Sequence, residues 1–260
     1  MTTEEIIIGI FCAVDDGLGV VLKERNAKLY PSEVVTIGIL FSLKGGRFRA
    51  FYRWLKRDYD CLFGGLPERS ALQKQLQRHE GLADQLLAEP SLLNVMDTFP
   101  IELRFPIRSG RSARQIGGKN RDKGRWSIGL KLCWILNRVG QVVGWHWLPM
   151  NHSDQDFLPL LDLLLEDGLV LTDLGFRCKS GTPPNLKLCL KGTWNDRMMV
   201  ETTFSLLTVI CHAKQMFHRT AHHLQARLAY TAAMFNILIR LARQLHPDDP
   251  FRTSIAEFSL

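Results

Sequence analysis

Long apolar runs are missing from this sequence of 260 residues, and their absence excludes a membrane-embedded protein. No stretch approaches the roughly 18 consecutive apolar residues with which a helix crosses a bilayer. The chain opens with Met-Thr-Thr-Glu-Glu, an acidic start that lacks the basic region of a secretory signal peptide. We therefore expect no membrane partner and a place in the cytoplasm.

Cysteine pairs and phosphate-binding loops are missing as well. The six cysteines are scattered without a CxxC pair, which disfavours both a disulfide framework and a zinc site. Thiols in this pattern are typical of small buried side chains in a reducing compartment. No glycine-rich loop of the P-loop type occurs, so the sequence indicates no nucleotide-driven mechanism.

Acidic residues are the scarcer charged type. Asp and Glu number 26 against 33 Lys and Arg, which gives a formal net charge of +7. This basic surplus favours a polyanionic partner, although it concerns binding and not the fold. The hydrophobic share of 46% is ordinary for a globular protein and suffices for one large core or two modest ones.

The first ninety residues carry helix signals. A Thr2–Glu5 pair typical of a capping box precedes apolar residues at helical spacing, and residues 34–43 form a second apolar body. Residues 47–57 combine aromatic side chains with five basic ones, and residues 68–79 are polar. A helix, a glycine-containing turn and a polar helix fit either a helix-turn-helix-like DNA reader or a small bundle with a solvated basic face.

We predict a helical domain over residues 1–90, and Pro90 as its boundary. If this domain reads DNA, its backbone contacts are expected from Arg47, Arg49 and Arg53.

From residue 91 the pattern changes to strands. The expected order is a strand at 94–101, a hairpin of strands at 127–136 and 141–148, a helix from residue 151, strands at 169–173 and 186–190, and helices at 196–211 and 222–245. This order predicts an α/β domain over residues 91–246, with a mixed sheet and helices on its faces. Residues 247–260 are expected to form a loose tail.

Two aspartates stand at the ends of apolar strands. Asp97 interrupts an apolar face formed by Val95, Phe99 and Ile101, and Asp173 follows a short, nearly all-apolar strand. A buried carboxylate is costly unless it is paired, hydrogen-bonded or bound to a metal. In open α/β sheets, ligands gather beyond the carboxyl ends of the strands. A single aspartate of this kind is equally typical of a turn acceptor.

A third acid, Glu201, borders the apolar stripe of the helix at 196–211, with Arg197 one turn before it. Taken alone, this pair reads as a simple i,i+4 ion pair. Three carboxylates beside a cationic loop indicate a Mg²⁺ site instead, with phosphate completing the coordination. Two such ions about 3.5–4 Å apart catalyse in-line displacement at phosphorus. Mn²⁺ is expected to substitute for Mg²⁺.

A strongly cationic segment lies between the first strand and the hairpin. Residues 104–125 contain eight basic residues, one acid and four glycines. Like charges in a loop repel each other unless an anion arrives, so we expect the segment to contact the phosphate backbone. We expect the contacts with the phosphate backbone to come from Arg108, Arg111, Arg114, Lys119, Arg121, Lys123 and Arg125.

Four short motifs together resemble the DDE-type transposases of bacterial insertion sequences. They are Asp97-Thr98-Phe99-Pro100, the stretch 128–132 (IGLKL), the stretch 171–176 (LTDLGF) and the stretch 197–205 (RMMVETTFS). Residues 31–36 (PSEVVT) also resemble the N-terminal part of that group. The likeness runs through most of the chain. It implies a ribonuclease H-like mixed sheet with flanking helices, preceded by a small helical DNA-binding domain.

The resemblance also implies an activity and a set of roles. Asp97, Asp173 and Glu201 correspond to the acidic triad that binds the metal, Arg197 to the arginine before the glutamate, and Lys131 to a lysine that contacts DNA. The implied partners are double-stranded DNA, as terminal inverted repeats and target, and a second copy of the chain; the implied place is the bacterial nucleoid. A nuclease without strand transfer, and a catalytically inactive DNA-binding protein, stay open as alternatives.

Two features depart from that family pattern. The interval between Asp173 and Glu201 is short, and Leu174 stands where a lysine is commoner. His152, Asp154 and Asp156 are candidates for a metal or acid–base cluster, but we favour the interpretation of Asp154 and Asp156 as acids stabilised by the dipole at a helix start.

Overall fold

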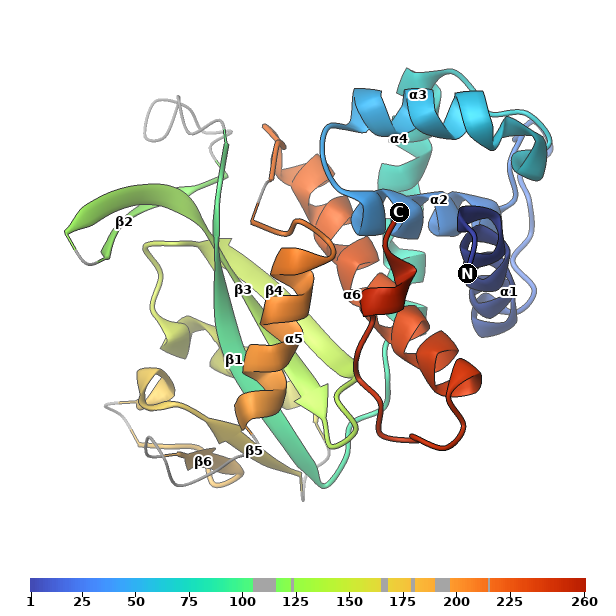
Figure 1. Ribbon diagram of the computed structural model, residues 1–260. Helices are drawn as coiled ribbons and strands as arrows, with labels where there is room; N and C mark the ends of the chain where they lie inside the picture. Colours follow the sequence, from blue (N-terminus) through green and yellow to red (C-terminus); the bar gives the residue numbers. More distant parts are fainter. Residues whose placement is uncertain (105–115, 123, 165–167, 179–180, 190–196, 215) are drawn as a thin grey trace. The chain divides into compact units, whose positions relative to one another are not determined.

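The computed structural model describes residues 1–260 except 105–115, 123, 165–167, 179–180, 190–196 and 215 (Figure 1). The side chains of Asp122, Arg197 and Met198 are also outside the description. The chain divides into two compact units. Unit 1 comprises residues 1–87, 209–212 and 220–260, and unit 2 comprises residues 88–208 and 213–219.

Unit 1 is helical. Its α-helices are α1 (Thr3–Leu18), α2 (Pro31–Lys44), α3 (Phe48–Asp58), α4 (Arg69–Arg78) and α6 (Ala221–Leu245), with short 3₁₀ helices η1 (Asp60–Phe63), η2 (Glu80–Leu86) and η5 (Ala256–Phe258). The predicted capping box is present: Thr2 Oγ1 accepts from the Glu5 N–H at 3.2 Å, and Glu5 Oε2 accepts from the Thr2 N–H at 2.7 Å. Local sequence therefore sets where α1 begins.

Helices α2 and α6 form the centre of unit 1. Both are apolar on nearly all sides, as expected of helices surrounded by others. Gly38 on α2 lies against the Tyr230 ring of α6 so closely that a Cβ there would be 2.6 Å from the ring. The buried Arg227 of α6 donates to the carbonyl oxygens of Phe41 and, at 3.1 Å, Ser42, which satisfies the end of α2.

Beyond residue 87, the observed domain boundaries differ from the predicted ones. Helix α6 was assigned to the second domain, but its contacts are with α1, α2, α4 and η2, so it belongs to unit 1. The tail from residue 247 is not loose throughout, because Ile255 and Phe258 are fully buried. Both differences have the same cause. The apolar stripe of α6 and the side chains of Ile255 and Phe258 must pack against a partner surface, and the order of elements in the sequence does not identify that surface.

Unit 2 is an α/β arrangement with a mixed six-stranded sheet. The strands are β1 (Leu93–Glu102), β2 (Gly118–Asp122), β3 (Arg125–Asn137), β4 (Val142–Pro149), β5 (Leu169–Thr172) and β6 (Leu186–Leu188). Strand β1 pairs antiparallel with β3 and parallel with β5, and β6 pairs parallel with β5. On its other edge β3 pairs with β2 near its start and with β4 along the rest. The predicted hairpin and strands are confirmed, whereas β2 was not predicted.

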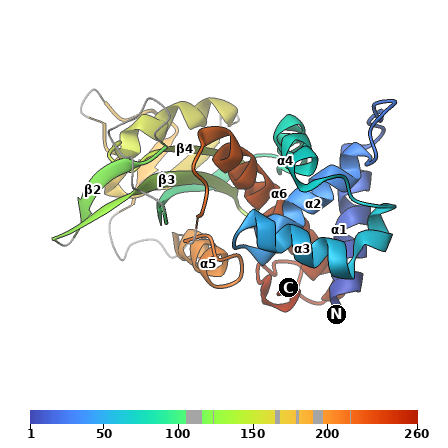
Figure 2. The same cartoon turned by 90° about the horizontal axis from the view of Figure 1, so that it is seen from above.

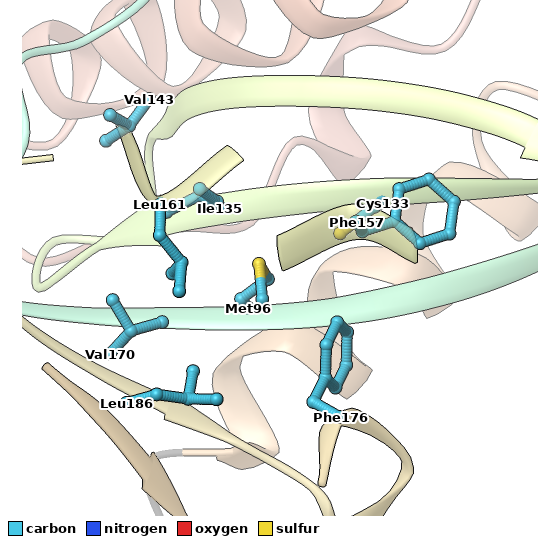
Figure 3. Close-up of a cluster of buried hydrophobic side chains, with 9 residues drawn as sticks. All are labelled: Met96, Cys133, Ile135, Val143, Phe157, Leu161, Val170, Phe176 and Leu186. Carbon is cyan, nitrogen blue, oxygen red and sulfur yellow. The ribbon is translucent and has the colours of Figure 1, made fainter. Parts of the chain in front are cut away.

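Helical segments accompany the sheet of unit 2. The helix α5 (Arg197–Val209) meets one face, where Phe204 stacks on Phe99 of β1 with ring centroids 4.9 Å apart. The 3₁₀ helix η3 (Asp154–Leu163) belongs to the opposite face, because its Phe157 and Leu161 join Met96 in a buried cluster (Figure 3). Met96 and Phe99 lie on opposite faces of β1 by the alternation of a strand. A turn of 3₁₀ helix, η4 (Leu174–Phe176), follows β5.

Candidate active site on strand β1 and after strand β5

Asp97 lies on β1 and on the α5 face of the sheet, two residues before Phe99. It is half-buried and pairs across the sheet with Trp134 of β3. Its Oδ1 accepts a 2.7 Å hydrogen bond from the N–H of Thr98. The carboxylate is therefore oriented by its own strand, in partly desolvated surroundings.

Asp173 comes directly after β5 and is held by the turn that follows. Its Oδ1 accepts a 2.8 Å hydrogen bond from the N–H of Gly175, which makes Asp173 the N-cap of η4. The parallel register pairs Leu93 with Leu169 and Val95 with Leu171. Continued by two residues, the register brings Asp173 level with Asp97 on the neighbouring strand. The described register ends with the Val95–Leu171 pair, and Asp97 and Asp173 each follow that pair by two residues.

Glu201 lies on α5, on the sheet face that carries Asp97. Its neighbour Val200 is fully buried and Phe204, one turn later, contacts both Phe99 and Trp134. Glu201 itself is exposed. Arg197 opens α5, but its side chain is outside the described part of the chain.

The metal site fits only in part. Within the described residues, no three His, Cys, Asp or Glu side chains gather closely enough to hold a metal ion. Mg²⁺ is bound in proteins by one or two carboxylates and completes its shell with water and phosphate, so the metal hypothesis for this region concerns Asp97 and Asp173. Mn²⁺ suits the same oxygen donors. The structure does not unite Glu201 with this pair, so it supplies no ligand set for a second ion.

Lys131 and Asp154 form an ion pair that the sequence did not reveal. Lys131 Nζ lies 2.8 Å from Asp154 Oδ1, and the two side chains are only 17% and 23% exposed. Lys131 was expected to contact DNA, yet here its ammonium group is engaged within unit 2. Asp154 was interpreted as an acid favoured by the helix dipole, and it does stand in the first turn of η3. Their partnership depends on how β3 and η3 meet, which leaves no local signal.

The pKa of the Cys133 thiol is affected by the negative charge of this region. Burial raises its pKa well above the ordinary value, and the nearby carboxylates of Asp97 and Asp154 raise it further. Cys133 therefore stays a neutral thiol and acts as a packing residue in the cluster of Figure 3.

The predicted phosphate contacts are placed in part. Lys119 and Arg121 lie on β2, with their charged groups 4.4 and 5.8 Å from the ring of the exposed Trp126. Arg125 pairs with Glu102 at 3.1 Å. Arg108, Arg111, Arg114 and Lys123 fall outside the described residues.

Helix α3 belongs to unit 1 (Figure 2). Arg49 and Arg53 are exposed one turn apart on this helix, and the exposed Arg47 directly precedes it. The opposite side of α3 is buried through Phe51, Tyr52 and Leu55. The helix therefore presents a cationic face to solvent.

Neither a scan against protein-family models nor a search of curated proteins found a match to this chain. No helix in the described ranges has both the length and the apolar character to cross a membrane.

Proposed function

We propose that this chain is a DDE-type insertion-sequence transposase that cuts DNA at element ends and joins the freed 3′ ends to target DNA. The observation that supports the proposal is the parallel pairing of β1 with β5, since a register continued two residues past the Val95–Leu171 pair would place Asp97 beside Asp173. The sheet supports it too, since a three-stranded antiparallel meander followed by two strands parallel to its first member suits a ribonuclease H-like domain.

The roles of the chain's own residues follow from their placement. Asp97 and Asp173 would hold Mg²⁺, which when bound polarises the phosphodiester and activates the attacking oxygen. The backbone N–H groups of Thr98 and Gly175 orient the two carboxylates. Arg49, Arg53, Lys119 and Arg121 supply positive charge for the DNA backbone. Two element ends cut in concert favour a dimer on DNA.

A plasmid-nicking assay tests the proposal. Supercoiled plasmid is incubated with the wild-type chain in Mg²⁺ or Mn²⁺, and with Asp97→Asn and Asp173→Asn. Both variants should nick more than about a hundredfold more slowly, because even the loss of an outer partner of a metal ligand costs roughly 10- to 100-fold. Asp162→Asn is the matched control, since Asp162 is an exposed acid of η3. Equal nicking by wild type and Asp97→Asn would refute the enzyme.

A second candidate is a transposase-derived protein that binds DNA without cutting it. The exposure of Glu201, away from any group that could hold a metal among the described residues, favours this alternative. Saturable DNA binding without nicking in either ion would support it. A nuclease without strand transfer would nick plasmid but fail to join an oligonucleotide bearing a free 3′-hydroxyl to it.

A further inference from the structure

Asp154 contacts both residues that orient the proposed metal-binding aspartates. Its Oδ1 accepts a 3.0 Å hydrogen bond from Thr98 Oγ1, and the Thr98 N–H is the group that holds Asp97. Thr98 points to the η3 face of β1, because it alternates with Asp97. Asp154 therefore acts on the Asp97 strand from behind the sheet.

The second link runs through Gly175. A Cβ placed on this residue would lie 2.7 Å from Asp154 Oδ2 and 2.9 Å from Asp173 Oδ1. Both separations are closer than real Cβ contacts, so the two carboxylates crowd the same side of Gly175. The Gly175 N–H is the donor that holds Asp173. Asp154 thus touches the backbone on which Asp173 depends.

Crowded carboxylates repel each other, and Lys131 offsets this repulsion. Its ammonium group lies 2.8 Å from Asp154 Oδ1, in a site where both side chains are mostly shielded from water. A charge-assisted hydrogen bond is stronger than a neutral one and fixes the carboxylate more firmly. Asp154 Oδ1 accepts hydrogen bonds from both Lys131 and Thr98, while Asp154 Oδ2 faces Gly175.

We propose that Asp154, with Lys131 as its counter-ion, is a positioning residue that fixes the separation of Asp97 and Asp173. The inference rests on the proposed function, since that function makes Asp97 and Asp173 the metal-binding residues. Asp154 lies between Thr98 of β1 and the turn after β5, so loss of its charge lets that turn shift relative to β1. A misplacement of about 1 Å at a metal-binding pair is enough to cost about a hundredfold in rate.

The test measures Mn²⁺ binding without DNA, by titration calorimetry, together with plasmid nicking and thermal unfolding. Asp154→Asn should weaken Mn²⁺ binding and slow nicking by about 10- to 100-fold, as expected for an outer partner of a metal ligand. Higher Mn²⁺ should recover part of the nicking rate. Thr98→Val keeps every charge and should show a smaller loss in the same direction. If Asp154→Asn fails to fold, the Mn²⁺ binding and nicking rate of Thr98→Val test the positioning role instead.

The matched control is Asp156→Asn, two residues along the same segment, where the carboxylate accepts from the Ser153 N–H at 3.0 Å and lies 3.1 Å from His152 Nδ1. It should bind Mn²⁺ and nick plasmid like the wild type. Wild-type binding and nicking in Asp154→Asn would overturn the positioning role and leave the proposed function intact. A wild-type chain that neither binds Mn²⁺ nor nicks plasmid would overturn both. Equal losses in the Asp154 and Asp156 variants would show a general charge effect and overturn the positioning role alone.

Discussion

The two aspartates of the proposed site are held by backbone groups close to them in the chain. Asp97 is bound by the next residue and Asp173 by the residue two positions on. Short aspartate side chains favour such local bonds, which set their orientation before any tertiary contact forms. The long-range bonds to Asp154 then act on the oriented groups, which is why one residue on η3 can influence both.

His223, in the first turn of α6, gives a pH prediction at this scale. Burial lowers its pKa below the ordinary value, and the neighbouring His222 lowers it further. Because the unfolded chain takes up the proton first, stability is full above the unfolded pKa of about 6.5 and falls as the pH drops below it. We expect His223→Gln to lose less unfolding free energy than the wild type between pH 7.5 and 5.5.

Urea unfolding followed by circular dichroism at several pH values measures this difference. Gln retains a hydrogen-bonding group for Thr220 Oγ1, which lies 2.5 Å from His223 Nδ1, so the two proteins should be similar in stability at pH 7.5. Parallel pH curves for variant and wild type would contradict the prediction.

At the scale of elements, the closest approach in unit 1 is between α2 and α6. Gly38→Ala places a Cβ 2.6 Å from the Tyr230 ring, whose hydroxyl donates to the Leu76 carbonyl at 2.8 Å. The ring is thus fixed at both ends of its side chain and cannot yield freely. We expect a loss of about 1–3 kcal/mol in unfolding free energy, as for other overpacked cores.

Gly9→Ala is the matched control, because Gly9 also lies inside a helix but meets only Leu241 at 3.8 Å. Alanine is the better helix former, so this variant should gain roughly 0.5–1 kcal/mol. Chemical denaturation of the two variants compares them. Similar changes in both would mean that the Gly38–Tyr230 contact does not limit the spacing of α2 and α6.

At the scale of the whole molecule, the net charge of +7 predicts salt-dependent binding to duplex DNA. Arg49→Gln with Arg53→Gln removes two exposed charges from one face of α3. If both contact phosphates, the slope of log K against log salt should become shallower by about 1.8, from roughly 0.9 for each contact. Fluorescence anisotropy with a labelled duplex at several salt concentrations measures the slope.

A second double variant separates specific contacts from overall charge. Arg25→Gln with Arg138→Gln removes the same charge from two exposed positions that are not part of α3. Its slope should stay near that of the wild type. Equal slopes in the two double variants would assign DNA binding to net charge and not to α3.

The sequence by itself determined the elements that depend on neighbours in the chain. Capping bonds at Thr2 and Glu5, the alternation along β1, and the hairpin of β3 and β4 are all local, and the structure confirms them. The meeting of Asp97 with Asp173 stays a prediction, because the described parallel register ends at Val95 and Leu171. The expected strand-end position of Asp97 is wrong, since β1 continues to Glu102. Strand β2 was not predicted, because the charges and glycines of the cationic segment mask the strand pattern.

Only the tertiary structure decided which surfaces meet. The assignment of α6 to unit 1, the burial of Phe258 and the Lys131–Asp154 pair all join residues far apart in sequence. Such contacts depend on the competition among several apolar faces for one partner, and periodicity describes each face without naming its partner. Asp154 therefore read as an ordinary helix-start acid in the sequence. Its place between Thr98 of β1 and the turn after β5 followed from the packing of η3 on the sheet.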